Sequence, residues 1–395
     1  MKGMVSTMKN RNILILYIVS IITLCAIAGL LVYAFQLQSQ KENESNENPT
    51  LSPNSSTATP TVSPSITPKT TQPPTPSPTP ALSPIVLGFA GDVNLSEDSK
   101  PVAKYDASGQ NITECLSEDL LDEMKAVDVM MLNNEFAYST RGTKTPNKSY
   151  TFRAHPKRVN ILKEMGVDIV SLANNHALDY GPDALADTFD TLDSAEIDYV
   201  GAGKDMNRAK EPIYYNVGGR KIAFVAASRV IYDVSWYATE AKLGMVGTYD
   251  PALILGSIKE AKQNSDFVVI FVHWGVERNN YPEAYQRTMA RQYIDAGADA
   301  VIGCHPHVMQ GVEYYKNKPI AYSLGNYWFN SSKKESGMVK LYVDTDNSIR
   351  FQLLPVMNKN TKTYLLTEES EKKAYYNFMR KISSAVTIDD DGFIH

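Results

Sequence analysis

The sequence predicts an α/β domain that begins near residue 85 and follows a membrane-spanning helix and a disordered linker. From Ile85 onward, short apolar runs alternate with helical patterns, which is typical of buried strands with largely parallel pairing. Ahead of this domain, the uncharged run Ile13–Phe35 is long enough to cross a bilayer of about 30 Å. Polar residues follow several of the strand-like runs and are the candidates for a functional site.

The sequence predicts a cytoplasmic N-terminus at residues 1–12 and an uncleaved transmembrane signal anchor at residues 13–35. Lys2, Lys9 and Arg11 precede the apolar run and acidic residues follow it, so the positive-inside rule places the rest of the chain outside the cell. A cleaved signal peptide is the alternative, but no clear small-x-small cleavage site follows the run. The predicted location is therefore the cell membrane, with an extracellular C-terminal domain.

Residues 36–84 predict a disordered linker. Eleven of the 21 prolines of the chain fall between Pro49 and Pro84, among Ser and Thr and almost no large apolar side chains. Such a segment cannot bury enough apolar surface to offset the entropy lost on ordering. We expect an extended chain with polyproline character and a rise of about 3.1 Å per residue, which lets the folded domain stand away from the membrane.

The folded domain is predicted over residues 85–358. Strands are predicted at 85–90, 128–132, 168–173, 198–201, 221–227, 267–273, 299–303, 319–324, 338–343 and 349–354, and helices at about 116–126, 157–165, 182–195, 251–264 and 283–297. The last two strands are separated by the polar segment 344–348 and predict an antiparallel hairpin. Residues 359–395 are polar and partly helical, which predicts a peripheral C-terminal tail.

Charge and cysteine content exclude two classes of protein. The chain carries 39 Lys+Arg against 44 Asp+Glu, whereas nucleic-acid-binding proteins normally have a basic surplus or stripe. We therefore predict no nucleic-acid partner. Only Cys115 and Cys304 lie in the folded part; a disulfide between them is possible outside the cell, but two cysteines are not a disulfide framework. Cys304 is interpreted as a small buried residue.

Polar residues gather where the predicted strands end, and ligands of α/β sheets bind at the carboxyl ends of strands. The segments are Gly91-Asp92-Val93-Asn94, Asn133-Asn134-Glu135, Asn174-Asn175-His176 with Asp179, His273-Trp274-Gly275-Val276-Glu277, His305-Pro306-His307 and Gly325-Asn326. A single Asp or His at such a place is usually a turn or packing residue, but the combined set indicates a site.

The chemistry of this set indicates metal binding. Carboxylates, amide oxygens and imidazoles suit Mn, Zn, Fe or Ni, and the absence of paired cysteines argues against a structural zinc site. The proline in His305-Pro306-His307 holds both rings on a stiff, bent backbone. Because the ligands exceed what one ion needs, we predict two divalent ions bridged by a carboxylate.

Six motifs in this sequence resemble, in their order, the CapA family of poly-γ-glutamate capsule biosynthesis proteins in the calcineurin-like metallophosphatase superfamily. They are Gly-Asp-x-Asn, Asn-x-Glu, Leu-Ala-Asn-Asn-His-Ala-Leu-Asp-Tyr-Gly, His-Trp-Gly-x-Glu, His-Pro-His-Val and Ser-Leu-Gly-Asn. The similarity covers roughly residues 85–358. It implies a four-layer α/β/β/α sandwich with a dinuclear metal site, and an N-terminal membrane anchor also fits this family.

The resemblance also implies roles for individual residues. Carried over by motif, Asp92 and His307 would bind one metal ion, Asn175, His273 and His305 would bind the second, and Glu135 would bridge both. His176 would be the neighbouring acid or a hydrogen-bond donor to the transition state, oriented by Asp179. Asn94, a further candidate ligand, stands where many superfamily members have a second His, and Glu135 stands where they have Asp; both differences alter ligand strength and reach.

A second group of residues is predicted to line the pocket or contact the substrate. It consists of Asn133, Asn174, Arg153, Trp274, Glu277 and Asn326. Arg153 precedes a predicted helix whose N-terminus would favour an anion, with an ordinary helix-entry loop as the alternative. Arg141, Lys144 and Lys148 form a basic loop that is interpreted as a solvated surface, with contact to an anionic polymer as the alternative.

Three hypotheses for function follow. The first is a metal-dependent hydrolase in poly-γ-glutamate capsule synthesis or export, acting on a phosphoryl or acyl centre. The second is a non-catalytic assembly component that binds the polymer or a membrane synthase. The third is an extracellular metal-dependent phosphoesterase unrelated to any capsule. The predicted partners are thus the anionic polymer and membrane synthase components.

Overall fold

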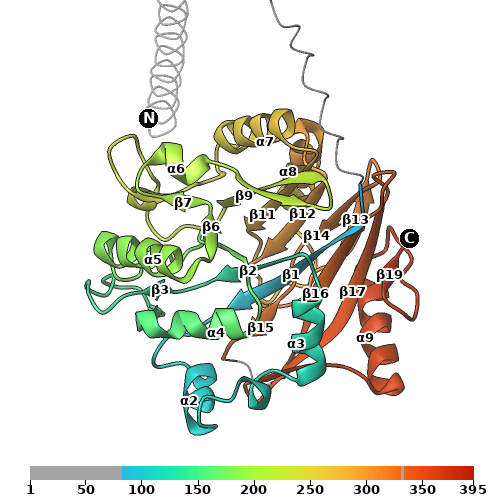
Figure 1. Ribbon diagram of the computed structural model, residues 1–395, viewed down its shortest axis with the longest axis horizontal. Helices are drawn as coiled ribbons and strands as arrows, with labels where there is room; N and C mark the ends of the chain where they lie inside the picture. Colours follow the sequence, from blue (N-terminus) through green and yellow to red (C-terminus); the bar gives the residue numbers. More distant parts are fainter. Residues whose placement is uncertain (1–81, 331–332) are drawn as a thin grey trace, which may run out of the picture. The chain divides into compact units, whose positions relative to one another are not determined.

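The computed structural model describes residues 82–330 and 333–395 (Figure 1). The predicted N-terminus 1–12, the predicted anchor 13–35 and all but the last residues of the predicted linker 36–84 lie outside these ranges. Within them, no helix is both long enough and apolar enough to cross a bilayer.

The larger of the two main sheets contains nine of the described strands, seven of them in the order β18-β17-β16-β1-β2-β5-β6. The strands β1 (Ile85–Val93), β2 (Val129–Asn134), β5 (Ile169–Ser171) and β6 (Asp198–Val200) are parallel neighbours. On the other side of β1, the strands β16 (Lys333–Val343), β17 (Ile349–Lys359) and β18 (Lys362–Leu365) are antiparallel. Two short strands complete the sheet: β15 (Asn326–Trp328) pairs with β1, and β19 (Phe393–Ile394) pairs with β17.

The smaller main sheet has six of the described strands, in the order β13-β14-β12-β11-β9-β8. Its parallel centre consists of β9 (Arg220–Ser228), β11 (Phe267–His273), β12 (Ala300–Cys304) and β14 (Lys318–Ala321). The edge strands β8 (Ile213–Val217) and β13 (Val312–Tyr315) are antiparallel to their neighbours. Two small ribbons pair β3 (Ala137–Tyr138) with β4 (Arg153–Ala154) and β7 (Ala202–Gly203) with β10 (Gly244–Met245).

The two main sheets pack face to face around a shared apolar core. In this core, Phe89 on β1 and Phe224 on β9 face each other across the two sheets with ring centroids 6.4 Å apart. Because successive strand residues point to opposite faces, the outer faces of both sheets also need cover. The helices α2 (Lys100–Ala107), α3 (Glu118–Lys125), α4 (Val159–Glu164) and α5 (Pro182–Ala195) cover the larger sheet, and α7 (Ala252–Asn264) and α8 (Ala284–Ala296) cover the smaller one (Figure 1).

Local sequence signals explain where these helices begin and end. Pro182 occupies the first turn of α5, where its missing N–H costs nothing. Glu283 and Gln286 form a reciprocal capping box at the start of α8, and Gly297, with φ +123°, ends that helix. The short helix α6 (Met206–Lys210) begins after Asp205, whose side chain accepts a hydrogen bond from the Arg208 N–H.

The predicted mixed α/β fold with multiple sheets is confirmed. All ten predicted strands and all five predicted helices are present close to the predicted positions. The hairpin predicted around 344–348 is the antiparallel pair β16 and β17. Short or polar elements went unpredicted, among them β8, β13, β15, α2 and α6. The possible disulfide is absent, because Cys115 and Cys304 are both buried free thiols.

The prediction of a peripheral tail at residues 359–395 is wrong. Strands β18 and β19 both pair with β17, and helix α9 (Glu369–Ile382) packs against the same strand. Tyr375, Tyr376 and Met379 of α9 are buried in the core shared by the two sheets. The segment looked peripheral because α9 is amphipathic: its many charged residues lie on the outer side, and only Tyr375, Tyr376, Met379 and Ile382 are buried.

Candidate metal centre

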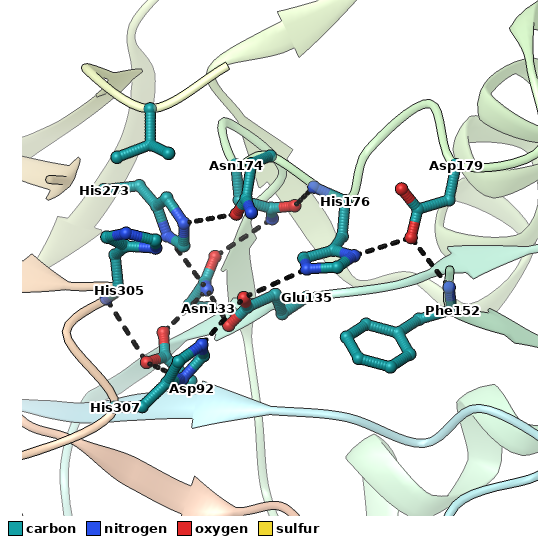
Figure 2. A network of polar contacts seen from close by, with 12 residues as sticks. Asp92, Asn133, Glu135, Phe152, Asn174, His176, Asp179, His273, His305 and His307 are labelled. Atoms are coloured by element: carbon teal, nitrogen blue, oxygen red, sulfur yellow. Dashed lines mark hydrogen bonds and ion pairs between the residues drawn. The ribbon is translucent and has the colours of Figure 1, made fainter. Parts of the chain in front are cut away.

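The polar residues predicted to form a site lie together at the carboxyl ends of parallel strands from both sheets (Figure 2). Asp92 lies near the end of β1, Glu135 follows β2, and Asn174 to His176 follow β5. From the smaller sheet, His273 ends β11 and Cys304 ends β12, with the two residues paired in register. Because the sheets pack face to face, the ends of their parallel strands meet in one place.

Two glycines allow the strand ends to come this close. A Cβ atom on Gly91 would lie 2.0 Å from the carbonyl oxygen of Gly325, and one on Gly303 would lie 2.2 Å from the carbonyl oxygen of Tyr322. Only glycine fits at either position, directly before Asp92 and Cys304. The turn after β12 is also tightly bent, since His305 and His307 both have positive φ, +97° and +57°.

Asp92, Glu135 and His307 form the first group of candidate ligands. Their ligand atoms lie within 4.8 Å of one another; His307 Nδ1 is 3.4 Å from Asp92 Oδ2, and His307 Nε2 is 3.8 Å from Glu135 Oε1. Burial and the neighbouring Asp92 carboxylate raise the pKa of Glu135 well above its ordinary value. Burial opposes the charge on His307, but the Glu135 and Asp92 carboxylates raise its pKa to about 10. The two carboxylates therefore stabilise a positive charge beside them, which His307 carries in this arrangement.

Glu135, His273 and His305 form the second group, and their ligand atoms also lie within 4.8 Å of one another. Asn175 joins it, because its Oδ1 lies 2.8 Å from His273 Nε2. Burial, followed by the charge of neighbouring histidines, lowers the pKa of His273 well below its ordinary value and that of His305 to about 3. Both rings are therefore neutral, which is the form that binds metals.

Buried polar atoms without partners indicate that these groups fit a metal ion. Glu135 Oε1 and His305 Nδ1 are buried and accept or donate no hydrogen bond within the described part of the chain. Such orphaned atoms are costly in a protein interior unless something else satisfies them. Both belong to the two ligand groups, so carboxylate, amide and imidazole donors surround the position where a divalent ion would satisfy them.

His176 lies beside this cluster in the position predicted for an acid. Its Nδ1 is 2.6 Å from Asp179 Oδ2, and its Nε2 faces Glu135 Oε1 at 3.8 Å (Figure 2). The Phe152 ring stacks on the imidazole with centroids 4.3 Å apart, and the Phe152 N–H donates to Asp179 at 2.7 Å. Burial lowers the pKa of His176, while Asp179 opposes this shift. One nitrogen is thus fixed by a carboxylate and the other is directed at the candidate ligands.

Three of the predicted pocket residues support the ligands through hydrogen bonds. Asn133 Nδ2 donates to Asp92 Oδ1 at 2.8 Å and to Glu135 Oε2 at 3.2 Å. Asn174 Nδ2 donates to Asn133 Oδ1 at 3.1 Å, and Asn174 Oδ1 accepts from the His176 N–H at 3.0 Å. Asn326 Oδ1 lies 2.7 Å from His307 Nδ1. These amides hold the ligand side chains in place.

The other predicted pocket residues lie elsewhere. The prediction that Trp274 lines the pocket is wrong, because its indole is buried against Tyr293 and Tyr322 on the helix side of the smaller sheet. Glu277 is exposed and makes no hydrogen bond or ion pair with any described residue. Arg153 lies over the Tyr180 ring and donates to the Arg141 carbonyl oxygen, outside the ligand groups.

Asn94 is buried, but its side-chain oxygen already accepts a hydrogen bond from the backbone. Its Oδ1 accepts the Ser96 N–H at 2.9 Å, and its Nδ2 has no partner among the described residues. An amide nitrogen is not a metal ligand. Metal binding by Asn94 therefore stays a prediction.

Lys148 is the residue that sequence reasoning missed most clearly. Its loop was predicted to be basic and solvated, yet the Lys148 ammonium is buried and donates to the Asn175 carbonyl oxygen at 2.5 Å and to Asp179. It also lies 3.1 Å from His176 Nδ1 and 5.1 Å from the centroid of the Trp236 ring. Burial lowers the pKa of Lys148, and Asp179 opposes this shift. No periodic pattern marks a single lysine in a loop as buried.

The comparison with protein families places this chain in one of them. The model of the bacterial capsule synthesis protein family PGA_cap matches residues 86–331, which is more than half of the chain. The protein therefore belongs to this family, and the resemblance to CapA proteins is confirmed.

Individual relatives agree with this assignment. The chain is 33% identical over 256 residues to the PGA biosynthesis protein CapA of Bacillus subtilis, a match that covers 63% of this chain and 66% of the relative. It is 32% identical over 245 residues to the capsule biosynthesis protein CapA of Bacillus anthracis, covering 60% and 59%. A probable polyglutamine synthesis accessory protein of Mycobacterium tuberculosis is 31% identical over 213 residues, covering 52% and 56%. The matched region thus spans about three-fifths of the length of these relatives.

Proposed function

We propose that this protein acts in the synthesis or export of a poly-γ-glutamate capsule, as a membrane-anchored extracellular hydrolase with a dinuclear metal site. The observation that carries the proposal is the pair of ligand groups that share Glu135, with the His176–Asp179 pair directly beside them. The roles named for the two Bacillus relatives, PGA biosynthesis and capsule biosynthesis, support the capsule part. The two face-to-face sheets with outer helices support a metallophosphatase-like α/β/β/α sandwich.

The residues of the two groups would hold two divalent ions of Mn, Zn, Fe or Ni. Asp92, Glu135 and His307 would bind one ion; Glu135, Asn175, His273 and His305 would bind the other. Bound ions would supply Lewis-acid chemistry that polarises a phosphoryl or acyl centre.

His176 would act as the acid for the leaving group. Asp179 accepts from Nδ1 and so leaves Nε2 facing the ligand groups, the side on which a substrate would lie. The stacked Phe152 ring and the buried Lys148 ammonium restrict movement of this pair. With both ring nitrogens protonated, His176 would therefore be a positioned proton donor, with Nδ1–H bound by Asp179 and Nε2–H facing the ligand groups.

The test combines metal analysis with turnover. Purified full-length protein should contain stoichiometric metal, and His273→Ala and His305→Ala should lose it. The metal-loaded protein should hydrolyse a phosphoester or a γ-glutamyl amide, with His176→Ala about 10²–10⁴-fold slower and unchanged metal content. His155→Ala is the control, because that histidine is exposed and outside the cluster.

Two outcomes would contradict this proposal. If metal-loaded protein turns over neither substrate class and His176→Ala leaves capsule formation intact, the hydrolase hypothesis fails. If phosphoesters are hydrolysed but deletion of the gene leaves the capsule unchanged, the protein is an extracellular phosphoesterase unrelated to capsule.

A non-catalytic role in assembly is the second candidate, and Asn94 is the observation that favours it. Asn94 Oδ1 already accepts a backbone N–H, so the first group is left with the two carboxylates and the imidazole of Asp92, Glu135 and His307. Weak occupancy of that group would suit binding of polymer carboxylates better than hydrolysis. Metal-dependent capture of polyglutamate or of a membrane synthase, without turnover, would support this role.

A further inference from the structure

His273 has a partner at each of its two ring nitrogens. Nε2 lies 2.8 Å from Asn175 Oδ1, on the side of the second ligand group. Nδ1 lies 3.3 Å from Cys304 Sγ, on the neighbouring strand. Both side chains are fully buried, so the sulfur is a permanent neighbour of this ring and not a chance surface contact.

Asn133 does not compete for Nδ1. Its Nδ2 lies 3.4 Å from that nitrogen, but its two hydrogens face closer oxygens, Asp92 Oδ1 at 2.8 Å and Glu135 Oε2 at 3.2 Å. Cys304 is therefore the group that satisfies Nδ1.

A thiol suits this position because it can both donate and accept a hydrogen bond. In the arrangement described, Nε2 faces an amide oxygen and carries the ring hydrogen, so Nδ1 accepts from the Cys304 S–H. A metal ion at Nε2 requires the ring hydrogen on Nδ1 instead. The sulfur then accepts it, and the thiol hydrogen turns to the Val272 carbonyl oxygen, 3.8 Å from Sγ. Neither His273 nor Cys304 changes its charge between the two arrangements. An ionised carboxylate in place of the thiol could only accept a hydrogen bond and would therefore fit only the arrangement with the hydrogen on Nδ1.

We propose that Cys304 is a positioning residue of the metal centre: its thiol holds the His273 ring in both tautomers and thereby presents Nε2 for metal binding beside Asn175. This inference rests on the proposed metal site. The orphaned Glu135 Oε1 and His305 Nδ1, both buried in the same cluster, independently indicate that an ion belongs there. Groups that orient a metal-binding histidine in this way typically change metal affinity about 10–100-fold when removed.

The competing arrangement is direct coordination by the sulfur. Asp92, His273 and Cys304 also have ligand atoms within 4.8 Å of one another, so a thiolate would reach an ion bound between them. The experiment must therefore separate a thiol that orients His273 from a thiolate that binds the metal.

The first measurement is zinc affinity of the purified full-length protein by competition with a chromophoric chelator. Cys304→Ala should bind zinc about 10–100-fold more weakly. Cys304→Ser, which keeps a donor and an acceptor, should recover most of the loss. Cys115→Ala is the matched control, because Cys115 is equally buried but lies in the outer core of the larger sheet. Circular dichroism and urea unfolding without metal show whether each variant is folded.

The second measurement is the tautomer of His273 by ¹⁵N NMR, with His273→Gln to assign its signals. Wild type should carry the hydrogen on Nε2 without metal and on Nδ1 with zinc. In Cys304→Ala, the zinc-free ring should keep its hydrogen on Nε2, because Asn175 Oδ1 still accepts it, whereas the Nδ1–H of the zinc form should lose its acceptor and show shifted ¹⁵N and ¹H signals. An Nδ1–H signal of the zinc form that is unchanged without the thiol would contradict the proposal even if the affinity falls for structural reasons.

Other outcomes are equally decisive. Unchanged zinc affinity in Cys304→Ala overturns this inference and leaves the metal site standing. A sulfur-to-cobalt charge-transfer band in the Co²⁺ form that Cys304→Ser removes would show a thiolate ligand, and it would overturn the positioning role. Failure of wild-type protein to bind zinc, cobalt or manganese would overturn both the inference and the proposed metal site.

Discussion

Lys148 joins three parts of the candidate site through one ammonium group. It donates to the Asn175 carbonyl oxygen and to Asp179, and it lies near the rings of Tyr232 and Trp236 in the segment after β9. Its side chain is only 8% exposed, and that of Asp179 is fully buried. A buried pair of this kind contributes little beyond a well-packed apolar pair, but removing one partner leaves an uncompensated charge.

We therefore expect Lys148→Met to destabilise the fold by about 3 kcal/mol, near the lower end for a broken buried pair. The lost free energy of unfolding should stay near this value, because Asp179 keeps its contacts with the Phe152 N–H and His176 Nδ1. Urea unfolding measures the difference. Lys144→Met in the same loop is the control, since Lys144 is exposed and should change stability by less than about 0.5 kcal/mol. Equal effects of the two substitutions would contradict the buried role of Lys148.

The proximity of the candidate ligands could be predicted from the sequence, and the burial of Lys148 could not, for a physical reason. Asp92, Glu135 and His273 follow apolar runs whose parallel ends must meet at one edge of a sheet, so their sequence positions already determine their proximity. Lys148 lies in a loop with no periodicity, and its burial depends on tertiary contacts with residues far along the chain. Trp274 was wrongly predicted to line the pocket, because a position at the end of a strand does not determine which face of the sheet the side chain lies on.

At the scale of secondary-structure elements, Arg158 ties the short helix η2 (Pro156–Arg158) to α2 and to the segment after β1. Its guanidinium bonds both oxygens of Glu97 and both oxygens of Asp106. Hydrogen bonds to Arg158 are the largest cause that lowers the pKa of each carboxyl. Arg158 is buried, whereas the two carboxylates are nearly half exposed.

This arrangement predicts a pH-dependent contribution to stability. Because both carboxyl pKa values are lower in the folded state, the stabilisation is present above their unfolded values and is lost as the pH falls through the folded ones. Because solvent screens the half-exposed carboxylates, Arg158→Met should cost only about 1 kcal/mol near pH 7, and the difference from wild type should shrink below about pH 4. Urea unfolding between pH 3 and pH 7 would check this. Lys157→Met, an exposed neighbour, should give a much smaller and flatter difference.

Helix α9 is the element whose role the sequence concealed. Its composition is charged, and only the spacing of Tyr375, Tyr376 and Met379 reveals an inward face. Strands such as β11 and β12 were predictable because each is a continuous apolar run. Elements such as β15 and β19 were not, because their few residues are stabilised by pairing with strands distant in the sequence.

Met379→Ala tests whether the C-terminal segment belongs to the core. The methionine is fully buried, so the substitution should destabilise the protein by about 2–5 kcal/mol through lost contacts and a residual cavity. Lys373→Ala on the exposed side of α9 should change stability by less than about 0.5 kcal/mol. The urea midpoints of the two variants give the comparison. A dispensable tail would show two equally small effects.

At the scale of the whole molecule, candidate ligands from separate parts of the chain meet only when both sheets are assembled. Asp92 and Glu135 come from the larger sheet, and His273, His305 and His307 come from the smaller one. The site thus depends on the core between the sheets, to which α9 also contributes. A destabilising substitution in that core should weaken metal binding even when it lies far from the ligands.

The N-terminal segment of the chain is proposed to anchor the protein in the membrane. The uncharged run 13–35 follows basic residues and precedes a proline-rich segment, so we expect the full-length protein to sediment with membranes and to stay there in high salt. Limited proteolysis of protoplasts from outside should cut within residues 49–81 and release a soluble, folded fragment that carries the metal site. A chain that begins at residue 82 behind a cleavable secretion signal is the control and should appear in the medium. If the native protein is itself found in the medium with its N-terminus beyond residue 35, the segment is a signal peptide and the anchor hypothesis is wrong.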